Sequence, residues 1–118
     1  MSTDSLVKQK SMEFAKRIVH LHKYLRQEHH EYVMSKQVLR SGTSIGANIA
    51  EAIYGSSRKD FVAKLQIAQK EAAETLYWLE LLSSCEYIPD ALFQSLAEDC
   101  REILAILVAA IKSCADTR

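Results

Sequence analysis

Apolar residues recur between residues 5 and 27 at alternating spacings of four and three residues. Such spacings place side chains along one side of an α-helix, as in the buried seam of a helical bundle. Most basic residues of the same stretch fall off the repeat and are expected to face solvent. The pattern predicts a first helix from about Ser5 to Gln27, followed by a polar turn at residues 28–31. The buried positions are Val7, Ser11, Phe14, Ile18, Leu21 and Leu25.

Three further segments carry helical repeats, each with a recognisable start or stop signal. Gly55 ends the second segment, and Ser57 opens the third with an approximate capping box that has Asp60 in place of Glu. Pro89 suits the first turn of the fourth. The expected helices run from Met34 or Ser35 to Gly55, from Ser56 or Ser57 to Ser83 or Ser84, and from Pro89-Asp90 onward. The buried stripes of the last two are Phe61, Leu65, Ala68, Ala72, Leu76 and Leu79, and Phe93, Leu96, Cys100, Ile103, Leu107, Ala110 and Cys114.

Four helices with short connections predict an all-α fold, an antiparallel up-down-up-down four-helix bundle. The chain has 118 residues, so we expect a single domain over residues 1–118. Only 3 Gly and 1 Pro are available for turns, which argues against a β-sandwich or a Rossmann unit.

Gly42, Gly46 and Ala50 recur at four-residue spacing inside the second helix. Glycine inside a helix costs about 1 kcal/mol relative to alanine, so a packing advantage should offset that cost. Residues four apart share one side of a helix, and these three form a smooth ridge. We therefore expect a neighbouring helix to approach the second helix closely along this ridge.

The fourth helix is apolar on every side from Ile103 to Ile111. A small bundle cannot cover all sides of one of its own helices, so the stretch favours a subunit interface over a locally buried helix end. Tyr77 and Trp78 are adjacent on the third helix and point about 100° apart, so one ring must lean away from the core. The interface candidates are Tyr77, Trp78, Ile103, Leu104, Leu107, Val108 and Ile111.

Charge is balanced overall but divided along the chain. Fifteen Lys and Arg match fifteen Asp and Glu, without the basic excess of a dedicated nucleic-acid binder. Residues 1–48 hold eight basic and four acidic side chains, a net charge of +4, and residues 49–118 carry −4. Seven basic residues remain candidates for phosphate contacts, and no aromatic side chain is spaced among them so as to predict base stacking. They are Lys8, Lys16, Arg17, Lys23, Arg26, Lys36 and Arg40.

Signals for targeting and for a membrane span are missing from the pattern. The sequence starts with polar residues, and its longest wholly apolar run is nine residues, against about 20 for a membrane span. The three cysteines, Cys85, Cys100 and Cys114, form no CxxC pair, and their odd number argues against a disulfide framework. These features predict a cytoplasmic protein with reduced thiols and no membrane association.

Catalytic and metal-binding motifs are also missing. Di-iron bundles use Glu-x-x-His pairs, and none occurs here. The chain has no nucleophile elbow and no phosphate-binding GxxxxGK[ST] loop. We expect no catalytic residue, no metal and no cofactor, and a protein that is not an enzyme.

Four polar residues share one side of the second helix, at spacings of four, four and three. Buried or half-buried polar groups must find partners, and three charged residues of the third helix are placed to supply them. Two interpretations stay open: a satisfied polar network that sets helix register, and the polar lining of a pore or ligand cleft. The two sets are Arg40, Ser44, Asn48 and Glu51, and Lys64, Glu71 and Glu74.

Two blocks of sequence carry a specific resemblance. SKQVLRSGTSIGANIAEA, residues 35–52, resembles the signature of the bacterial four-helix-bundle proteins named after 23S ribosomal RNA intervening sequences. DFVAKLQIA, residues 60–68, and KEAAETLYWLELL, residues 70–82, are similar to the second block of that family. The resemblance covers nearly the whole chain in the same helical order.

The resemblance implies a four-helix bundle that assembles as a homopentameric ring. A related branch, the accessory variability proteins of diversity-generating retroelements, forms strongly basic rings that bind nucleic acid and a reverse transcriptase. The balanced charge of this sequence departs from that branch. No catalytic residue is known in the family. The positions that match the two blocks are Gly42, Ser44, Gly46, Asn48, Ala50 and Glu51, and Glu71, Glu74 and Trp78.

Together these observations predict a non-enzymatic homo-oligomer, expected to be a pentamer, that acts as an interaction module or scaffold for a protein or RNA partner. The alternative is a direct nucleic-acid binder that uses the basic side of the first helix, repeated around the ring. A third hypothesis is an enzyme or metal protein built on the carboxylates of the second and third helices.

Overall fold

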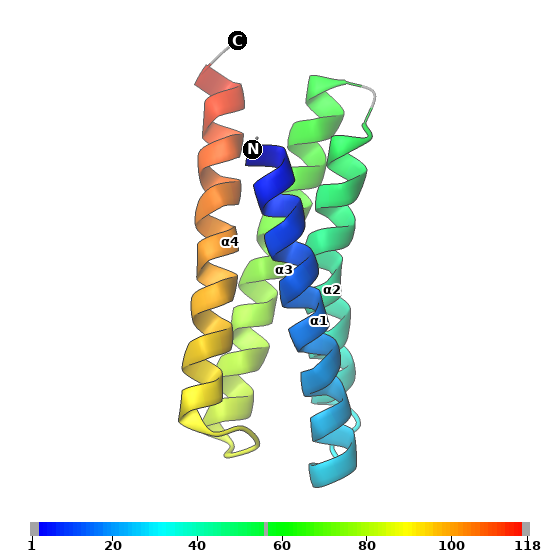
Figure 1. The fold of residues 1–118 in the computed structure, drawn as a ribbon, viewed down its shortest axis with the longest axis vertical. Helices are drawn as coiled ribbons and strands as arrows, with labels where there is room; N and C mark the ends of the chain where they lie inside the picture. Colours follow the sequence, from blue (N-terminus) through cyan, green and yellow to red (C-terminus); the bar gives the residue numbers. More distant parts are fainter. Residues whose placement is uncertain (1–2, 56, 117–118) are drawn as a thin grey trace.

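The structure is a computed structural model that describes residues 3–55 and 57–116. The described residues form four α-helices: α1 (Thr3–His29), α2 (Met34–Ile53), α3 (Arg58–Ser84) and α4 (Asp90–Asp116). The helices run antiparallel in an elongated bundle of 48 × 23 × 22 Å (Figure 1). The start of α1 and the end of α4 lie at the same end of the bundle as the α2–α3 connection (Figure 1). The expected all-α four-helix bundle is confirmed.

Each helix packs against two neighbours. Helices α1 and α3 each contact α2 and α4, and the described residues make no close backbone contact across either diagonal of the bundle. This is the up-down-up-down arrangement that short connections favour. Among the described helices, none combines the length and the apolar character needed to cross a membrane.

The helix ends depart from the predicted ones by about two residues. Helix α1 continues through His29, so the connection to α2 lies two residues later than expected, and α2 ends at Ile53. Helix α1 reaches His29 because the left-handed residue that ends it is His30, with a φ of 51°, after which the Glu31 N–H donates to the Leu25 carbonyl oxygen at 3.0 Å. Ser57 caps α3 as predicted, accepting a 3.0 Å hydrogen bond from the Asp60 N–H. Ser56, the other expected start of this helix, lies outside the described residues.

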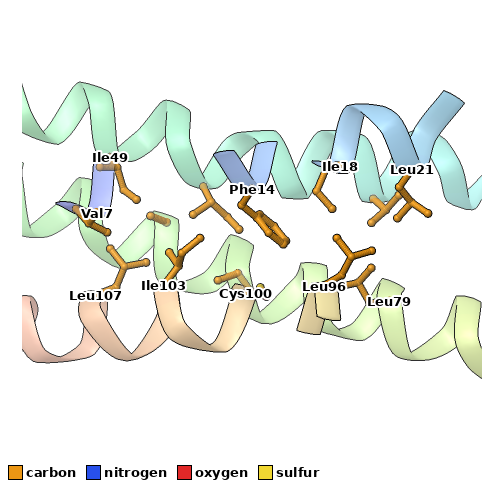
Figure 2. Packing of buried hydrophobic residues seen from close by; sticks show 14 of the residues in the cluster. Val7, Phe14, Ile18, Leu21, Ile49, Leu79, Leu96, Cys100, Ile103 and Leu107 are labelled. Atoms are coloured by element: carbon orange, nitrogen blue, oxygen red, sulfur yellow. The ribbon is translucent and has the colours of Figure 1, made fainter. Parts of the chain in front are cut away.

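The core is built from the predicted apolar stripes. Every member of the α1 repeat is buried, and Phe14 and Ile18 meet α4 and α3 side chains such as Leu96 and Leu79 in the centre of the bundle (Figure 2). Ser11, the one polar member, donates a 3.0 Å hydrogen bond to the Lys8 carbonyl of its own helix. Four members of the α3 and α4 stripes lie at the edge of the core and are only partly buried: Phe61, Leu76, Phe93 and Ala110. Cys114, also in the predicted stripe, is partly buried but is not packed against the core.

Candidate functional site

The glycine ridge of α2 faces α1, as predicted. A Cβ atom added at Gly42 would lie 2.8 Å from two side-chain carbons of Ile18, which is fully buried. One added at Gly46 would lie 3.3 Å from Ser11 Oγ. The missing side chains thus let the two helices approach, most tightly at Gly42. Ala50, the third member of the ridge, lines a groove between α1 and α2 beside Gly46.

The predicted polar residues meet along the seam between α2 and α3. Arg40 donates a hydrogen bond of 2.9 Å to Glu71 Oε2 and forms a second ion pair with Glu74. Trp78 Nε1 donates to the same Glu74 carboxylate over 2.9 Å. The hydrogen bond from Trp78, and then the one from Arg40, hold the pKa of Glu74 below its ordinary value. The pKa of Arg40 is raised, chiefly by its hydrogen bond to Glu74.

Further along this seam the contacts are simpler. Lys64 Nζ lies 3.0 Å from Glu51 Oε1. Asn48 Nδ2 donates to the carbonyl oxygen of Ser44, one turn earlier in its own helix, over 2.8 Å. Arg40, Asn48 and Glu51 therefore find partners on α3 or within their own turn, as expected of a network that sets helix register.

A buried hydroxyl pair beneath this network was missed by the sequence reasoning. The Thr75 hydroxyl lies 2.9 Å from Ser41 Oγ and 2.8 Å from the Glu71 carbonyl oxygen, and both side chains are fully buried. Thr75 follows Ala72 by three residues and precedes Leu79 by four, so the apolar stripe of α3 already marked its position. Ser41 likewise follows Val38 by three residues and precedes Ile45 by four, so what the sequence lacked was the alignment of α2 with α3.

Tyr77 and Trp78 form an outward aromatic pair. Tyr77 is 58% exposed, and its ring meets that of Trp78 at 73° with centroids 5.0 Å apart. Trp78 is half-buried against the core, and its indole N–H donates to Glu74. On α4, Val108 is 46% exposed. These side chains give the bundle apolar surface beyond its own core.

The prediction that the whole apolar stretch of α4 offers an interface is wrong for two of its residues. Ile103 and Leu107 are each 1% exposed and point into the core (Figure 2). They continue the stripe of Leu96 and Cys100, so the helix keeps one buried side even where every residue is apolar. Leu104 and Ile111 are half-buried at the edge of the core.

The seven basic candidates do not share one surface. Arg17 pairs with Asp99 of α4 at 2.7 Å, and its guanidinium also reaches Ser95. Arg40 lies in the α2/α3 network. Both arginines are thus engaged by carboxylates of a neighbouring helix, and Lys36 is exposed on α2.

Four of these residues do fall on one side of α1. At 100° per residue, Lys8, Lys16, Lys23 and Arg26 lie within a sector of about 80° around the helix, and all four are exposed. We call these four residues the α1 basic face. Lys16 also pairs with Glu13 at 3.1 Å, an exposed contact that weakly neutralises it.

Two exposed tyrosines lie against this face. Lys8 Nζ lies 5.3 Å from the ring centroid of Tyr54, and Arg26 Cζ lies 4.8 Å from that of Tyr32. Both distances are those of cation–π contacts. The sequence spacing did not predict base stacking, and these two tyrosines were missed because they come from the connections on either side of α2, which bring them to the ends of α1.

Cysteines and histidines do not gather into a reactive cluster. Within the described residues, no three His, Cys, Asp or Glu side chains are close enough together to hold a metal ion. Cys85, Cys100 and Cys114 are not joined in disulfides. Burial raises the pKa of Cys100 to about 12, and its thiol donates to the Ala72 carbonyl over 3.4 Å. This thiol stays protonated at neutral pH and packs as part of the core.

The fold and the sequence resemble those of a protein of known structure. A crystal structure of a protein of unknown function from the S23 ribosomal protein family of Bacteroides thetaiotaomicron is 57% identical to this chain, with a TM-score of 0.93. The match covers 94% of this chain and 99% of that chain. No curated protein matches. The family model for the 23S rRNA-intervening sequence protein matches residues 3–109, and the chain belongs to this family.

Proposed function

We propose that the protein is a non-enzymatic, homo-oligomeric interaction module, for which the family resemblance suggests five subunits. The aromatic pair Tyr77–Trp78 carries this proposal. Tyr and Trp are among the residues that contribute most to protein interfaces, and here both lie at the surface of one helix. Three cysteines that remain thiols support a reducing compartment, which we take to be the cytoplasm.

The side chains of Tyr77 and Trp78 are held in place by contacts within the chain itself, without a partner. Arg40 and Trp78 both bind the Glu74 carboxylate, and Tyr77 packs edge-on against the indole. A side chain that is already fixed loses little conformational entropy on binding, so more of its contact energy appears as affinity. Ile67, 42% exposed on the same helix, adds apolar area.

Native mass spectrometry of the purified chain tests the proposal. We expect an oligomer, and we expect Tyr77→Glu and Val108→Glu each to lower the mass of the assembly. Met12→Glu is the matched control, because Met12 is equally exposed, at 56%, on α1. A monomeric wild type, or a mass that neither substitution changes, would refute this interface.

Nucleic-acid binding is the second candidate function. It is favoured by the tyrosines that flank the α1 basic face, since single-stranded nucleic acid is bound by cations along its backbone and by aromatic rings beneath its bases. Tyr54 is 78% exposed and thus accessible for stacking. An oligomer would repeat the face around its circumference.

Titration with a single-stranded RNA at several salt concentrations tests this second function. We expect affinity to fall as salt rises, and Lys16→Glu and Lys23→Glu to weaken binding and flatten that dependence. Lys70→Glu, an exposed lysine on α3, is the matched control. Absence of binding at low salt, or equal affinity in all three variants, would refute it.

A further inference from the structure

A groove of about 660 Å³ opens between the first two turns of α3 and the last two turns of α4. One wall consists of Val62, Ala63 and Gln66, and the other of Ile111, Cys114 and Ala115. In Figure 1 the end of α4 extends beyond the first turn of α1. The groove forms because the two facing walls carry alanines, whose small side chains leave the space between the helices unfilled.

The charge around this groove is uneven. Arg58 and Lys59 line its end at the start of α3, and among the side chains that the structure describes no Asp or Glu lines it. The positive end of the α3 dipole lies at the same place. The remainder of the lining is apolar apart from the Gln66 amide. Asp60, in the same turn as the two cations, does not line the groove.

We propose that this groove binds a free medium- or long-chain carboxylate, with the alkyl chain between α3 and α4 and the carboxylate beside Lys59. The volume falls within the range of small-molecule sites, roughly 300–1,000 Å³. Positive charge at one end only matches an amphiphile with a single anionic head. A protein partner would not require the positive charge to be confined to one end of the groove. The site is separate from Tyr77 and Trp78 and is independent of the interaction proposed above.

Dodecanoate, used below its micelle concentration, is the probe, and calorimetry on the full chain is the measurement. We expect saturable binding of one dodecanoate per chain. Ala63→Phe places a ring in the groove and should weaken binding at least tenfold. Ala73→Phe, an equally exposed alanine of α3 outside the lining, should change it less than twofold.

The head-group assignment has its own pair of variants. Lys59→Glu should weaken dodecanoate binding about fivefold or more and should not weaken binding of dodecyltrimethylammonium, which has a cationic head. Lys70→Glu makes the same charge change on α3 away from the groove and should leave dodecanoate binding unchanged. Circular dichroism confirms that each variant is folded.

Three outcomes would overturn the proposal. The first is the absence of saturable dodecanoate binding. The second is equal binding of both amphiphiles with no effect of Ala63→Phe, which would indicate adsorption elsewhere on the apolar surface. The third is a lower native mass of Ala63→Phe without dodecanoate binding, which would make the groove an interface between copies of the chain.

Discussion

Helix α2 meets its two neighbours through sides of different chemistry. Toward α1 it presents Gly42 and Gly46, and the contact is between backbone and the side chains of Ile18 and Ser11. Toward α3 it presents Arg40 and Ser41, whose contacts are ion pairs and hydrogen bonds. At Gly42 the first seam has no room for added atoms, and the second seam depends on groups that are present. Adding atoms should therefore disrupt one seam, and removing a partner should disrupt the other.

The largest effect is expected at Gly42. Gly42→Ala puts a methyl group 2.8 Å from a fully buried, stiff Ile18 side chain, an overpacking that costs about 3 kcal/mol. The gain in helix propensity is about 1 kcal/mol, so the free energy of unfolding should fall by about 2 kcal/mol. Gly46→Ala is the control, because its 3.3 Å contact is with a serine hydroxyl that can rotate. Urea denaturation of both variants gives the comparison, and equal stabilities would contradict the tight contact at Gly42.

The buried hydroxyl pair tests the second seam by removal. Thr75→Val keeps the shape of the side chain but leaves Ser41 buried without its partner, at a cost of about 1–2 kcal/mol. Adding Ser41→Ala should recover part of that loss, because two apolar groups need no hydrogen bond. Urea denaturation of the two single variants and the double variant closes a double-mutant cycle. Strict additivity would show that the two hydroxyls do not interact.

The same two seams show what periodicity can and cannot predict. Spacings of three and four gave the right side of α1, including the buried Ser11, and placed Gly42 opposite a neighbouring helix. The pairing of Arg40 with Glu71 and Glu74 was also predicted, since each helix had few charged residues on the relevant side. In these cases the positions could be predicted from the regular spacing of residues along each helix taken by itself.

Prediction failed where apolar residues did not alternate with polar ones, and where the position of a residue depends on the connections between helices or on how two helices are aligned. Helix α4 is apolar all round from Ile103 to Ile111, so composition could not separate core from surface there, and Ile103 and Leu107 were assigned both to the buried stripe and to an interface. The positions of Tyr32 and Tyr54 depend on the connections on either side of α2, which have no repeat. Ser41 could not be paired with Thr75 without knowing how α2 and α3 are aligned.

A substitution at Trp78 tests whether its hydrogen bond to Glu74, or only the packing of its ring, stabilises the seam between α2 and α3. Trp78→Phe keeps an aromatic ring but removes the N–H that Glu74 accepts at 2.9 Å, which should lower the free energy of unfolding by about 1 kcal/mol at this partly exposed site. Tyr77→Phe is the matched control and should cost less than about 0.5 kcal/mol, as for a surface position. Thermal unfolding of the two variants checks the difference. Equal losses would mean that ring packing, and not the hydrogen bond, fixes the indole.

The smallest expected effect is the change with pH in what the Glu74 carboxylate contributes to the free energy of unfolding. Because the pKa of Glu74 is lowered below its ordinary value of 4.5, first by Trp78 and then by Arg40, the folded state binds its proton less readily than the unfolded state. This contribution to stability is complete above pH 4.5 and disappears as the pH falls through the lower, folded-state pKa.

Glu74→Gln retains a carbonyl acceptor for Trp78 but has no charge, so its deficit in unfolding free energy relative to wild type should shrink between pH 7 and pH 3. The side chain is 35% exposed, which limits the change to under about 1 kcal/mol. Denaturation curves between pH 7 and pH 3 measure this change. Trp78→Phe removes the larger of the two hydrogen-bond contributions to the lowered pKa of Glu74, so the pH dependence of its stability should lie between those of wild type and Glu74→Gln. A deficit that is constant with pH would show that Glu74 stabilises the seam by shape rather than by charge.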